Sequence, residues 1–487
     1  MFGTDVFGLF TTQAQKFGEK CAVRFGSHTI SYSRLLDAVE RLASALLKLE
    51  VVKGDRFAIM LPNVPQFVIG YLALLRLGVT AVLVDPGSDD DALQSVLRRT
   101  GPKGIIALDR FASRIDAAAR EAGELRHRIY LGDPVPGSYN LTQLLTHADH
   151  ADVPWEVNET DPAVIYFTAG TTGLPKGVQF SHNGLLAKIY SIRYTLALTS
   201  GHTMFCLSTF AHAFWNLVNL LSPLMSGSEL ILFPRFDLNE VEAAFQEHAN
   251  IILFESPRTL QQIARLEQGA VPKDRVTLCI STSRFLSKRT VGAWRDKFGV
   301  AVLNSYGITE AGPLLTLEDP WETAPTRRVG TPCYGVQLKL ADLYDNGQPL
   351  PLIGELVVKS SSLMQGYVGD TTGDTRIDPN GWLCTSDVGS LDAQGRVFLL
   401  GRKRDVIVKG GFPVLPYEVE SVIASHPKVK TCRVNRIPSE TLGEDFKVSV
   451  VPIPGSGLSP REVVRFLSRS LQGYKRPKQI EIVDVLN

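Results

Sequence analysis

The sequence predicts an α/β protein with a large N-terminal domain, residues 1–403, and a small mobile α+β C-terminal domain, residues 404–487. Short apolar strands alternate with amphipathic helical segments over much of the first 300 residues. After Arg328 the strands become short and glycines frequent, which is typical of antiparallel β structure. We therefore expect parallel-sheet α/β subdomains and a β-rich subdomain in the large domain.

The middle of the chain gives the clearest alternation of elements. Strands followed by helices of this length predict parallel sheets with helices on their faces. Ligands of such sheets bind beyond the carboxyl ends of the strands. The predicted strands are Glu229–Phe233, Ile251–Phe254, Val276–Ile280 and Val300–Leu303, and the predicted helices are Leu238–His248, Pro257–Leu266 and Ser287–Phe298.

The last third of the chain gives shorter elements. Strands are expected at Gln337–Ala341, Gly354–Lys359 and Gly395–Leu399. Helices are expected at Pro416–Ser425 and Ser459–Leu471, between further strands. These last elements are enough for a small α+β domain.

Composition excludes several classes of protein. Lys and Arg total 51 against 50 Asp and Glu, so no global field favours nucleic acid or an anionic membrane. The six cysteines contain no CxxC pair, which argues against a disulfide framework and favours a reducing compartment. No secretory signal or membrane span is expected, because neither pattern occurs in the sequence. A cytoplasmic location is therefore predicted.

A loop rich in glycine and threonine follows the apolar run at 163–167. Glycines let a backbone approach a ligand closely, and N–H groups, hydroxyls and an ammonium on one loop suit phosphate oxygens. The spacing is not that of a Walker P-loop. The predicted phosphate-binding residues are Thr168, Gly170, Thr171, Thr172, Gly173 and Lys176.

A second motif, Asn304-Ser305-Tyr306-Gly307-Ile308-Thr309-Glu310, comes where a strand is expected to end. A carboxylate beside a phosphate site is suited to holding Mg²⁺ with the triphosphate. The aromatic ring of Tyr306 beside Gly307 suits contact with a base or an acyl group. The two motifs together predict that Lys176 and Glu310 converge on one polyanion.

These two motifs resemble those of the adenylate-forming enzymes, a family that includes acyl-CoA synthetases, luciferase and peptide-synthetase adenylation domains. The resemblance implies ATP-dependent activation of a small carboxylic acid as an acyl-adenylate, followed by thioester formation with coenzyme A. It implies catalytic roles for Lys176, Glu310 and Thr309. It also implies that Glu310 binds Mg²⁺, that Thr309 contacts the α-phosphate, and that Tyr306 and Gly307 border the adenine.

Further motifs extend the resemblance toward the C-terminus. Asp387 matches the aspartate that accepts hydrogen bonds from the ribose hydroxyls, and Arg402 matches an arginine that meets the ribose or phosphate. Arg404 occupies the position of the hinge about which the small domain turns. Gly410 and Gly411 match the loop that lines the thiol tunnel.

The acyl pocket is expected at His212, Phe214 and Trp215, where relatives often carry a histidine that gates the thiol. The same residues also suit a buried core segment. The sequence departs from the family pattern at Ala169, at Ser386 and at Thr209. It also replaces a glycine-rich turn by 281–285, where side chains such as Arg284 narrow the space for adenine and substrate.

The family pattern ends with a Gly-Lys that this sequence does not reach before Asn487. A shortened chain is the favoured explanation; a naturally short member and a non-catalytic relative are the others. The favoured function is an AMP-forming acyl-CoA synthetase for a fatty or aryl acid. The alternatives are an acyl-AMP ligase that loads the phosphopantetheine arm of an acyl carrier protein, and a catalytically impaired nucleotide-binding relative.

Overall fold

The computed structural model describes most of the chain, and its contacts divide it into two compact units. The first unit comprises Met1–Gln337 and Val358–Leu383, and the second comprises Leu338–Val357 and Cys384–Asn487. The predicted division at residues 403 and 404 stays a prediction. The described residues are 5–123, 125–147, 153–168, 175–267, 269, 271–282, 288–320, 327–343, 353–369 and 376–486.

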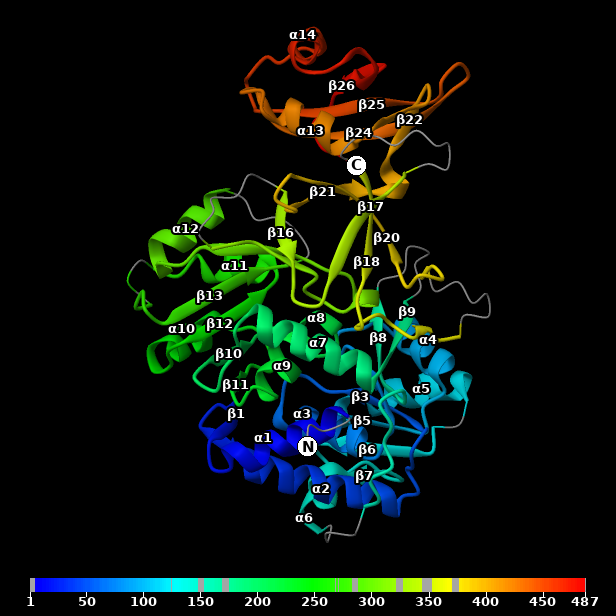
Figure 1. Ribbon diagram of the computed structural model, residues 1–487, viewed down its shortest axis with the longest axis vertical. Coiled ribbons are helices and arrows are strands. Elements are labelled where there is room, and N and C mark those ends of the chain that lie inside the picture. The colour runs from blue at the N-terminus through cyan, green and yellow to red at the C-terminus, as the bar shows by residue number, and fades with distance from the viewer. Residues whose placement is uncertain are drawn as a thin grey trace. The chain divides into compact units, whose positions relative to one another are not determined.

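One sheet of the first unit is largely parallel. Helices α4 (Asp90–Thr100) and α5 (Ala112–Ala122) pack on one of its faces (Figure 1). Helix α3 (Pro65–Arg76) lies on the other, where Gly70 faces Ile59 and Ile106. The strand order is β19 (Gly366–Tyr367), β9 (Lys176–Ser181), β8 (Pro162–Thr168), β4 (Thr80–Leu83), β3 (Arg56–Met60), β5 (Gly104–Leu108), β6 (His127–Leu131) and β7 (Tyr139–Asn140).

The first unit contributes a second run of strands, which is parallel from β1 to β14 and antiparallel at its ends. The order is β16 (Arg328–Pro332), β15 (Thr316–Leu317), β14 (Val302–Tyr306), β13 (Val276–Ser281), β12 (Ile251–Glu255), β10 (Thr203–Cys206), β11 (Glu229–Leu232), β1 (Cys21–Phe25) and β2 (His28–Ser31). The predicted parallel α/β architecture is confirmed.

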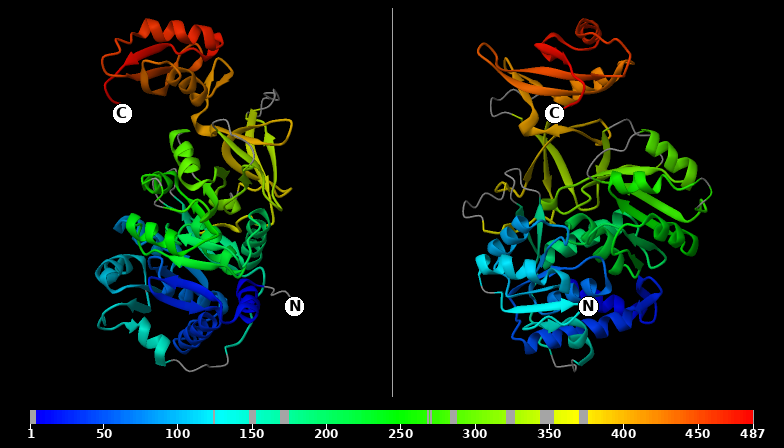
Figure 2. Two further views of the ribbon diagram at one scale, coloured as in Figure 1. Left: turned by 90° about the vertical axis from the view of Figure 1, so that its left-hand side faces the viewer. Right: turned by 180° about the vertical axis from the view of Figure 1, so that it is seen from behind.

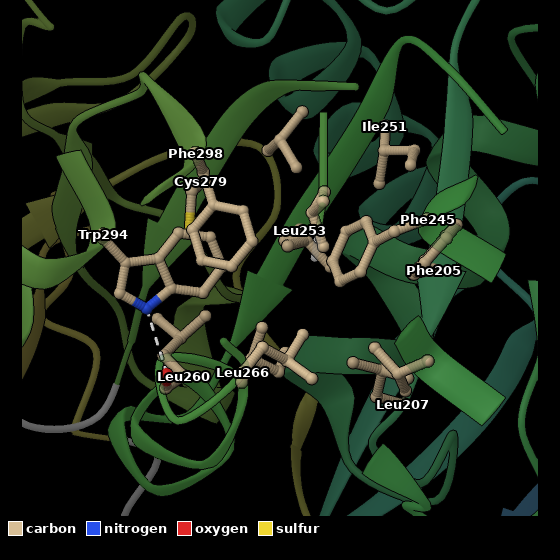
Figure 3. Packing of buried hydrophobic residues seen from close by; sticks show 14 of the residues in the cluster. Phe205, Leu207, Phe245, Ile251, Leu253, Leu260, Leu266, Cys279, Trp294 and Phe298 are labelled. Carbon is tan, nitrogen blue, oxygen red and sulfur yellow. Dashed lines mark hydrogen bonds between the residues drawn. The ribbon is translucent and has the colours of Figure 1, made fainter. Parts of the chain in front are cut away.

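Three helices cover one face of this sheet. They are α10 (Leu238–Glu247), α11 (Pro257–Ile263) and α12 (Lys288–Phe298). Trp294 of α12 is fully buried, packs on Phe298 and donates from Nε1 to the Leu260 carbonyl at 3.0 Å (Figure 3). This hydrogen bond satisfies the indole N–H within an otherwise apolar core.

The remaining described helices of the first unit are α1 (Val6–Phe17), α2 (Tyr32–Lys48), α6 (Leu141–His147), α7 (His182–Thr195), α8 (Ala213–Trp215) and α9 (Ser222–Leu224). A π-helical turn, η2 (Asn216–Leu221), joins α8 to α9. Helix α7 begins directly after β9 because Ser181 caps it, accepting a hydrogen bond from the Gly184 N–H at 3.1 Å.

The second unit contains an antiparallel segment and a C-terminal α+β segment. Strand β21 (Val397–Arg402) is antiparallel to β20 (Leu383–Leu391), which confirms antiparallel structure here. The other described strands are β17 (Gln337–Ala341), β18 (Ile353–Lys359), β22 (Ile407–Lys409), β23 (Phe412–Val414), β24 (Val429–Ser439), β25 (Gly443–Pro452) and β26 (Gln479–Ile482).

Helices α13 (Pro416–Ala424) and α14 (Pro460–Ser470) pack against the C-terminal strands and share one apolar core with them (Figure 2). Val419, Phe446, Val448 and Val463 are fully buried there. No helix among the described residues is long and apolar enough to cross a bilayer.

Two predicted strands are displaced toward the C-terminus. We expected strands at Val300–Leu303 and Gly395–Leu399, but the structure has β14 at Val302–Tyr306 and β21 at Val397–Arg402. Gly395 has φ +74° and belongs to the turn before β21. Both strands run farther than their apolar residues indicate because ladder hydrogen bonds to neighbouring strands continue past the apolar run.

Candidate active site

The predicted phosphate loop joins two antiparallel strands, β8 and β9. Thr168, the last residue of β8, pairs with Lys176, the first residue of β9. Lys176 is exposed, and its Nζ lies 5.0 Å from the centroid of the Tyr367 ring. The remaining members of the predicted set, Gly170, Thr171, Thr172 and Gly173, lie outside the described residues.

Glu310 lies on a short 3-10 turn, η3 (Thr309–Ala311), that follows β14. Its Oε1 accepts a hydrogen bond from the Tyr367 hydroxyl at 2.8 Å and another from Arg376 Nη2 at 2.7 Å. Lys176 and Glu310, predicted to converge from distant parts of the sequence, thus both contact Tyr367. We call Lys176, Glu310, Tyr367 and Arg376 the Tyr367 cluster.

Tyr367 remains a hydrogen-bond donor in this cluster. Burial raises the pKa of its hydroxyl well above the usual range, and the adjacent Glu310 carboxylate raises it further. The hydroxyl therefore keeps its proton and donates a hydrogen bond to Glu310. Arg376 Nη2 also donates to the Tyr367 oxygen, so one ring orients both charged groups.

The sequence analysis did not identify Tyr367 and Arg376. Tyr367 follows a glycine in the short edge strand β19, which pairs with β9 and so brings the ring beside Lys176. Arg376 has φ +56°, a left-handed conformation that arginine rarely adopts. Neither residue belongs to a motif with phosphate or metal spacing. The pairing of β19 with β9 shows the position of Tyr367, and the hydrogen bond to Glu310 shows that of Arg376.

The predicted adenine-contacting residues lie at the end of β14. Tyr306 is largely buried, and its carbonyl accepts the Leu315 N–H at 2.7 Å. Gly307 has no room for a side chain, because an added Cβ would lie 2.7 Å from the Leu314 nitrogen. Glycine is therefore required there for close packing of the chain, and this explains the Tyr-Gly pair without reference to a ligand.

The predicted acyl pocket residues lie on and beside α8. His212 occupies the N-cap position of that helix without a side-chain capping hydrogen bond, and its ring centroid is 5.6 Å from that of Trp215. The Phe214 ring stacks on Phe254 of β12, with centroids 6.4 Å apart and planes 11° from parallel. His212 Nε2 lies 3.4 Å from Asp85 Oδ2, a neighbour that the sequence did not reveal.

Polar side chains gather at the carboxyl ends of β12 and β13. Glu255 is completely buried and pairs in register with Ser281. Burial raises the pKa of Glu255 to about 8 in spite of the hydrogen bond that Ser208 donates to it. Arg284, which we expect to narrow the space for adenine and substrate, lies outside the described residues.

The predicted ribose-binding residues pair with each other in the second unit. Asp387 of β20 is opposite Arg402 of β21 in the antiparallel register, and Arg402 Nε lies 3.0 Å from Asp387 Oδ1. Asp387 is buried, whereas the Arg402 side chain is half exposed. An oriented carboxylate beside a half-exposed cation is suited to binding vicinal hydroxyls and a phosphate.

Ser386 is one of the departures from the family pattern. It has φ +63°, a conformation that glycine adopts without strain and serine does not. Its N–H donates to Glu355 Oε1 at 2.9 Å, which holds the strained backbone in place. The turn that relatives form with glycine is therefore built here with serine.

The predicted hinge and thiol-tunnel residues also lie in the second unit. Arg404 is exposed, in the 3-10 turn η4 (Lys403–Asp405) that precedes β22. Gly410 and Gly411 form the turn between β22 and β23, with φ +58° and +84°. Their roles stay predictions.

The Tyr367 cluster is compatible with Mg²⁺. No group of three or more His, Cys, Asp or Glu among the described residues is arranged to hold a metal ion by itself. Mg²⁺ commonly takes one or two carboxylates and completes its coordination with phosphate oxygens and water. Glu310 supplies one such carboxylate, so the residues present fit a cation delivered with a triphosphate.

Comparison with known proteins supplies the family. A model of the AMP-binding enzymes matches residues 10–368, and a model of the AMP-binding enzyme C-terminal domain matches residues 418–487. 4-coumarate–CoA ligase 1 of Petroselinum crispum is 28% identical, with 97% of this chain and 89% of that protein aligned. A 3-[(3aS,4S,7aS)-7a-methyl-1,5-dioxo-octahydro-1H-inden-4-yl]propanoyl:CoA ligase of Mycobacterium tuberculosis is 30% identical, with 93% and 90% aligned.

The structural comparison agrees. The crystal structure of ATP-bound MatB from Rhodopseudomonas palustris superposes with a TM-score of 0.84 at 26% identity, covering 99% of this chain and 96% of that one. The predicted family and fold class are thus confirmed over nearly the whole chain, and the chain belongs to the family of AMP-binding, adenylate-forming enzymes.

Proposed function

We propose that this protein joins a carboxylic acid with an aryl or bulky apolar tail to coenzyme A, through an acyl-adenylate. The observation that carries the proposal is the convergence of Lys176 and Glu310 on Tyr367. A cation and a carboxylate oriented by one ring suit a metal-bound triphosphate, since the cation meets phosphate oxygens and the carboxylate meets Mg²⁺.

The enzyme class rests on the family. The protein is an acid–thiol ligase that uses ATP, Mg²⁺ and coenzyme A, and its partners are small-molecule acids. Bound Mg²⁺ would supply charge neutralisation at the phosphates. The chain's own contribution is to orient that charge, through Lys176 on β9 and Glu310 on η3.

The remaining roles follow the motifs. Thr168 and the loop 169–174 would bind phosphate oxygens, Thr309 the α-phosphate, and Tyr306 the adenine. Asp387 would accept hydrogen bonds from the ribose hydroxyls, with Arg402 beside it. Transfer to the thiol would follow a turn of the small domain about Arg404.

The class of acid follows from the relatives and from aromatic side chains near His212. Relatives include a 4-coumarate–CoA ligase and a feruloyl-CoA synthase, whose acids are aromatic. Phe214 stacks on Phe254, and Trp215 packs on His212, so flat apolar surfaces lie at the predicted acyl site. An aryl tail matches these surfaces better than a small polar acid does.

The experiment is a panel of aryl, fatty and small acids, with ATP and Mg²⁺, in which pyrophosphate release is measured. Aryl acids should give the highest kcat/KM, and coenzyme A should convert the adenylate to a thioester faster than an acyl carrier protein does. Lys176→Met should lower release with every acid by a similar factor, because Lys176 is not expected to contact the tail. Release with none of the acids would refute the proposal.

A cytoplasmic location is part of the proposal. All six cysteines are free, as expected for a reducing compartment. Fractionation of the native cell with detection of the protein would test this.

A further inference from the structure

His212 and Asp85 come from the carboxyl ends of strands in two different sheets of the first unit. Asp85 follows β4, and His212 lies on the segment that follows β10. His212 Nε2 and Asp85 Oδ2 are 3.4 Å apart. Both side chains remain partly accessible, with 43% and 34% of their surface exposed. A ligand at these strand ends can therefore reach the imidazole.

Buried amide side chains hold the segment that carries His212. Asn63 is buried, and its Nδ2 donates to the carbonyls of Cys206 and Ser208 at 3.0 and 2.9 Å. Its Oδ1 accepts the Phe210 N–H at 3.0 Å. Asn216 Nδ2 donates to the Phe210 carbonyl at 3.1 Å. The backbone before His212 is thus held by two buried amide side chains.

Asp85 is fixed in turn. Its Oδ1 accepts the Gly87 N–H at 2.9 Å, which leaves Oδ2 directed to the imidazole. Hydrogen bonding to His212 is the largest factor that lowers the pKa of Asp85, so the carboxylate is ionised at neutral pH. On the same loop, Asp90 is engaged by Arg114 at 2.6 Å and so does not compete for the imidazole. Within the described chain, His212 and the Gly87 N–H are the groups that lower the pKa of Asp85.

We propose that Asp85 is a positioning residue that holds the imidazole of His212 in the Nε2–H tautomer, with Nδ1 as the free acceptor. This inference rests on the proposed function, because it assigns a role in thioester formation. A carboxylate that accepts one N–H of an imidazole fixes both its tautomer and its orientation, and leaves the other nitrogen able to take a proton.

The step that this arrangement serves is transfer of the acyl group to coenzyme A. The thiol proton passes to Nδ1 of His212 as the sulfur bonds to the acyl carbon. The bond from that carbon to the phosphate oxygen breaks, and AMP leaves with the electron pair. The imidazolium that forms is stabilised by the adjacent Asp85 carboxylate.

The test separates the two half-reactions. Asp85→Asn keeps the size of the side chain and an acceptor for Gly87, but removes the charge. We expect it to slow thioester formation from preformed acyl-adenylate about tenfold or more, while pyrophosphate release changes less than twofold. Asp89→Asn is the matched control, since Asp89 caps α4 on the same loop and does not touch His212.

A spectroscopic readout keeps the test independent of turnover. In nitrogen-15 correlation spectra, the His212 signal, identified by its loss in His212→Gln, should show the Nε2–H tautomer in the unmodified protein. It should show a mixture in Asp85→Asn and in Asp85→Ala. Unchanged tautomers in both variants, or equal losses in both half-reactions, would overturn the inference. Absence of pyrophosphate release by the unmodified protein would refute the proposed function instead, and the spectra would still decide the role of Asp85.

Discussion

The Tyr367 cluster and the interior of the first unit handle charge in opposite ways. In the cluster, Glu310 meets Arg376 at 2.7 Å, and Lys176 lies over the same ring. In the interior, Glu255 and Lys188 are completely buried, and neither has an ion-pair partner among the described residues. Unpaired buried groups such as these two change their pKa.

Lys188 is the clearest example of an unpaired buried group. It lies on α7, and its Nζ has no hydrogen-bond partner in the described part of the chain. Burial lowers its pKa to about 8. Gly312 accommodates its stem, since a Cβ there would lie 2.6 Å from Lys188 Cε. The comparison teaches that the charges predicted to meet a ligand have neighbours and are partly accessible, whereas the completely buried ones are expected mainly to affect stability.

The largest expected effect on activity concerns the Tyr367 cluster. Glu310→Gln keeps the shape of the side chain but removes the charge expected to hold Mg²⁺. Pyrophosphate release should fall about 100-fold, which corresponds to about 2.7 kcal/mol, with every acid that the enzyme accepts. Binding of Mn²⁺ with ATP, measured by electron paramagnetic resonance, should weaken as well. Glu159→Gln, an exposed residue in the same unit, is the control. Normal pyrophosphate release by Glu310→Gln would show that the charge of Glu310 is not needed. The contrast between the Tyr367 cluster and the buried groups would then fail.

Glu255 should give the largest effect on stability. With a pKa of about 8, the folded protein keeps a proton that the unfolded chain loses above its ordinary pKa of 4.5. The free energy of unfolding therefore falls as pH rises from 4.5 to 8. Glu255→Gln removes this penalty and should stabilise the protein at pH 8 by an amount on the order of 3 kcal/mol.

Urea unfolding at pH 5 and pH 8 measures the effect. The advantage of Glu255→Gln should be present at pH 8 and small at pH 5, and Glu159→Gln should show no such difference. An equal effect at both pH values would mean that Glu255 is ionised in the folded protein and has a partner.

Local sequence patterns were sufficient for most of the fold, because each apolar run or amphipathic period reports on its own element. Strand β17 at Gln337–Ala341 was predicted with its observed bounds, and α10 and α13 within one residue. Strand β14 was misplaced, since its second half is polar and is held by a ladder to β15. Ladder partners distant in sequence leave no local signal.

The same reasoning applies to the site. Lys176 and Glu310 could be predicted as site residues because their motifs have distinctive spacing. Asp85 and Arg376 could not be identified, because their importance comes only from what lies beside them in space: an imidazole for one, a carboxylate for the other. Ser386 was flagged as a departure, and its positive φ supplies the physical reason.

Lys188 should change the free energy of unfolding with pH in the direction opposite to Glu255. Between pH 8 and 10.5 the unfolded chain binds more protons than the folded one, so the free energy of unfolding rises with pH in that range. Lys188→Met should stabilise the protein at pH 7 by an amount on the order of 2 kcal/mol, and the advantage should shrink toward pH 10. Thermal unfolding at pH 7 and pH 9.5 measures it. Lys48→Met at the end of α2 is a control, because Lys48 is exposed. Destabilisation at pH 7 would show that Lys188 binds a buried anion.

Tyr367→Phe should give the smallest effect of these substitutions, and it tests whether the Tyr367 hydroxyl orients Glu310. It removes the hydroxyl that donates to Glu310 but keeps the ring beneath Lys176 and the Glu310–Arg376 ion pair. The loss of one hydrogen bond to a charged group, partly replaced by water, should cost about 1 kcal/mol. We therefore expect kcat/KM for ATP to fall roughly fivefold, with KM for the acid unchanged.

Tyr194→Phe is the matched control for this change, because the Tyr194 side chain is exposed. Adenylate formation at varied ATP and fixed acid gives the measurement. If Tyr367→Phe changes KM for the acid instead, the ring belongs to the acyl site, and the charges of the cluster are oriented by Arg376 alone. If Tyr367→Phe changes neither KM for the acid nor kcat/KM for ATP, water replaces the hydroxyl. Tyr367 then does not orient the charges of the cluster.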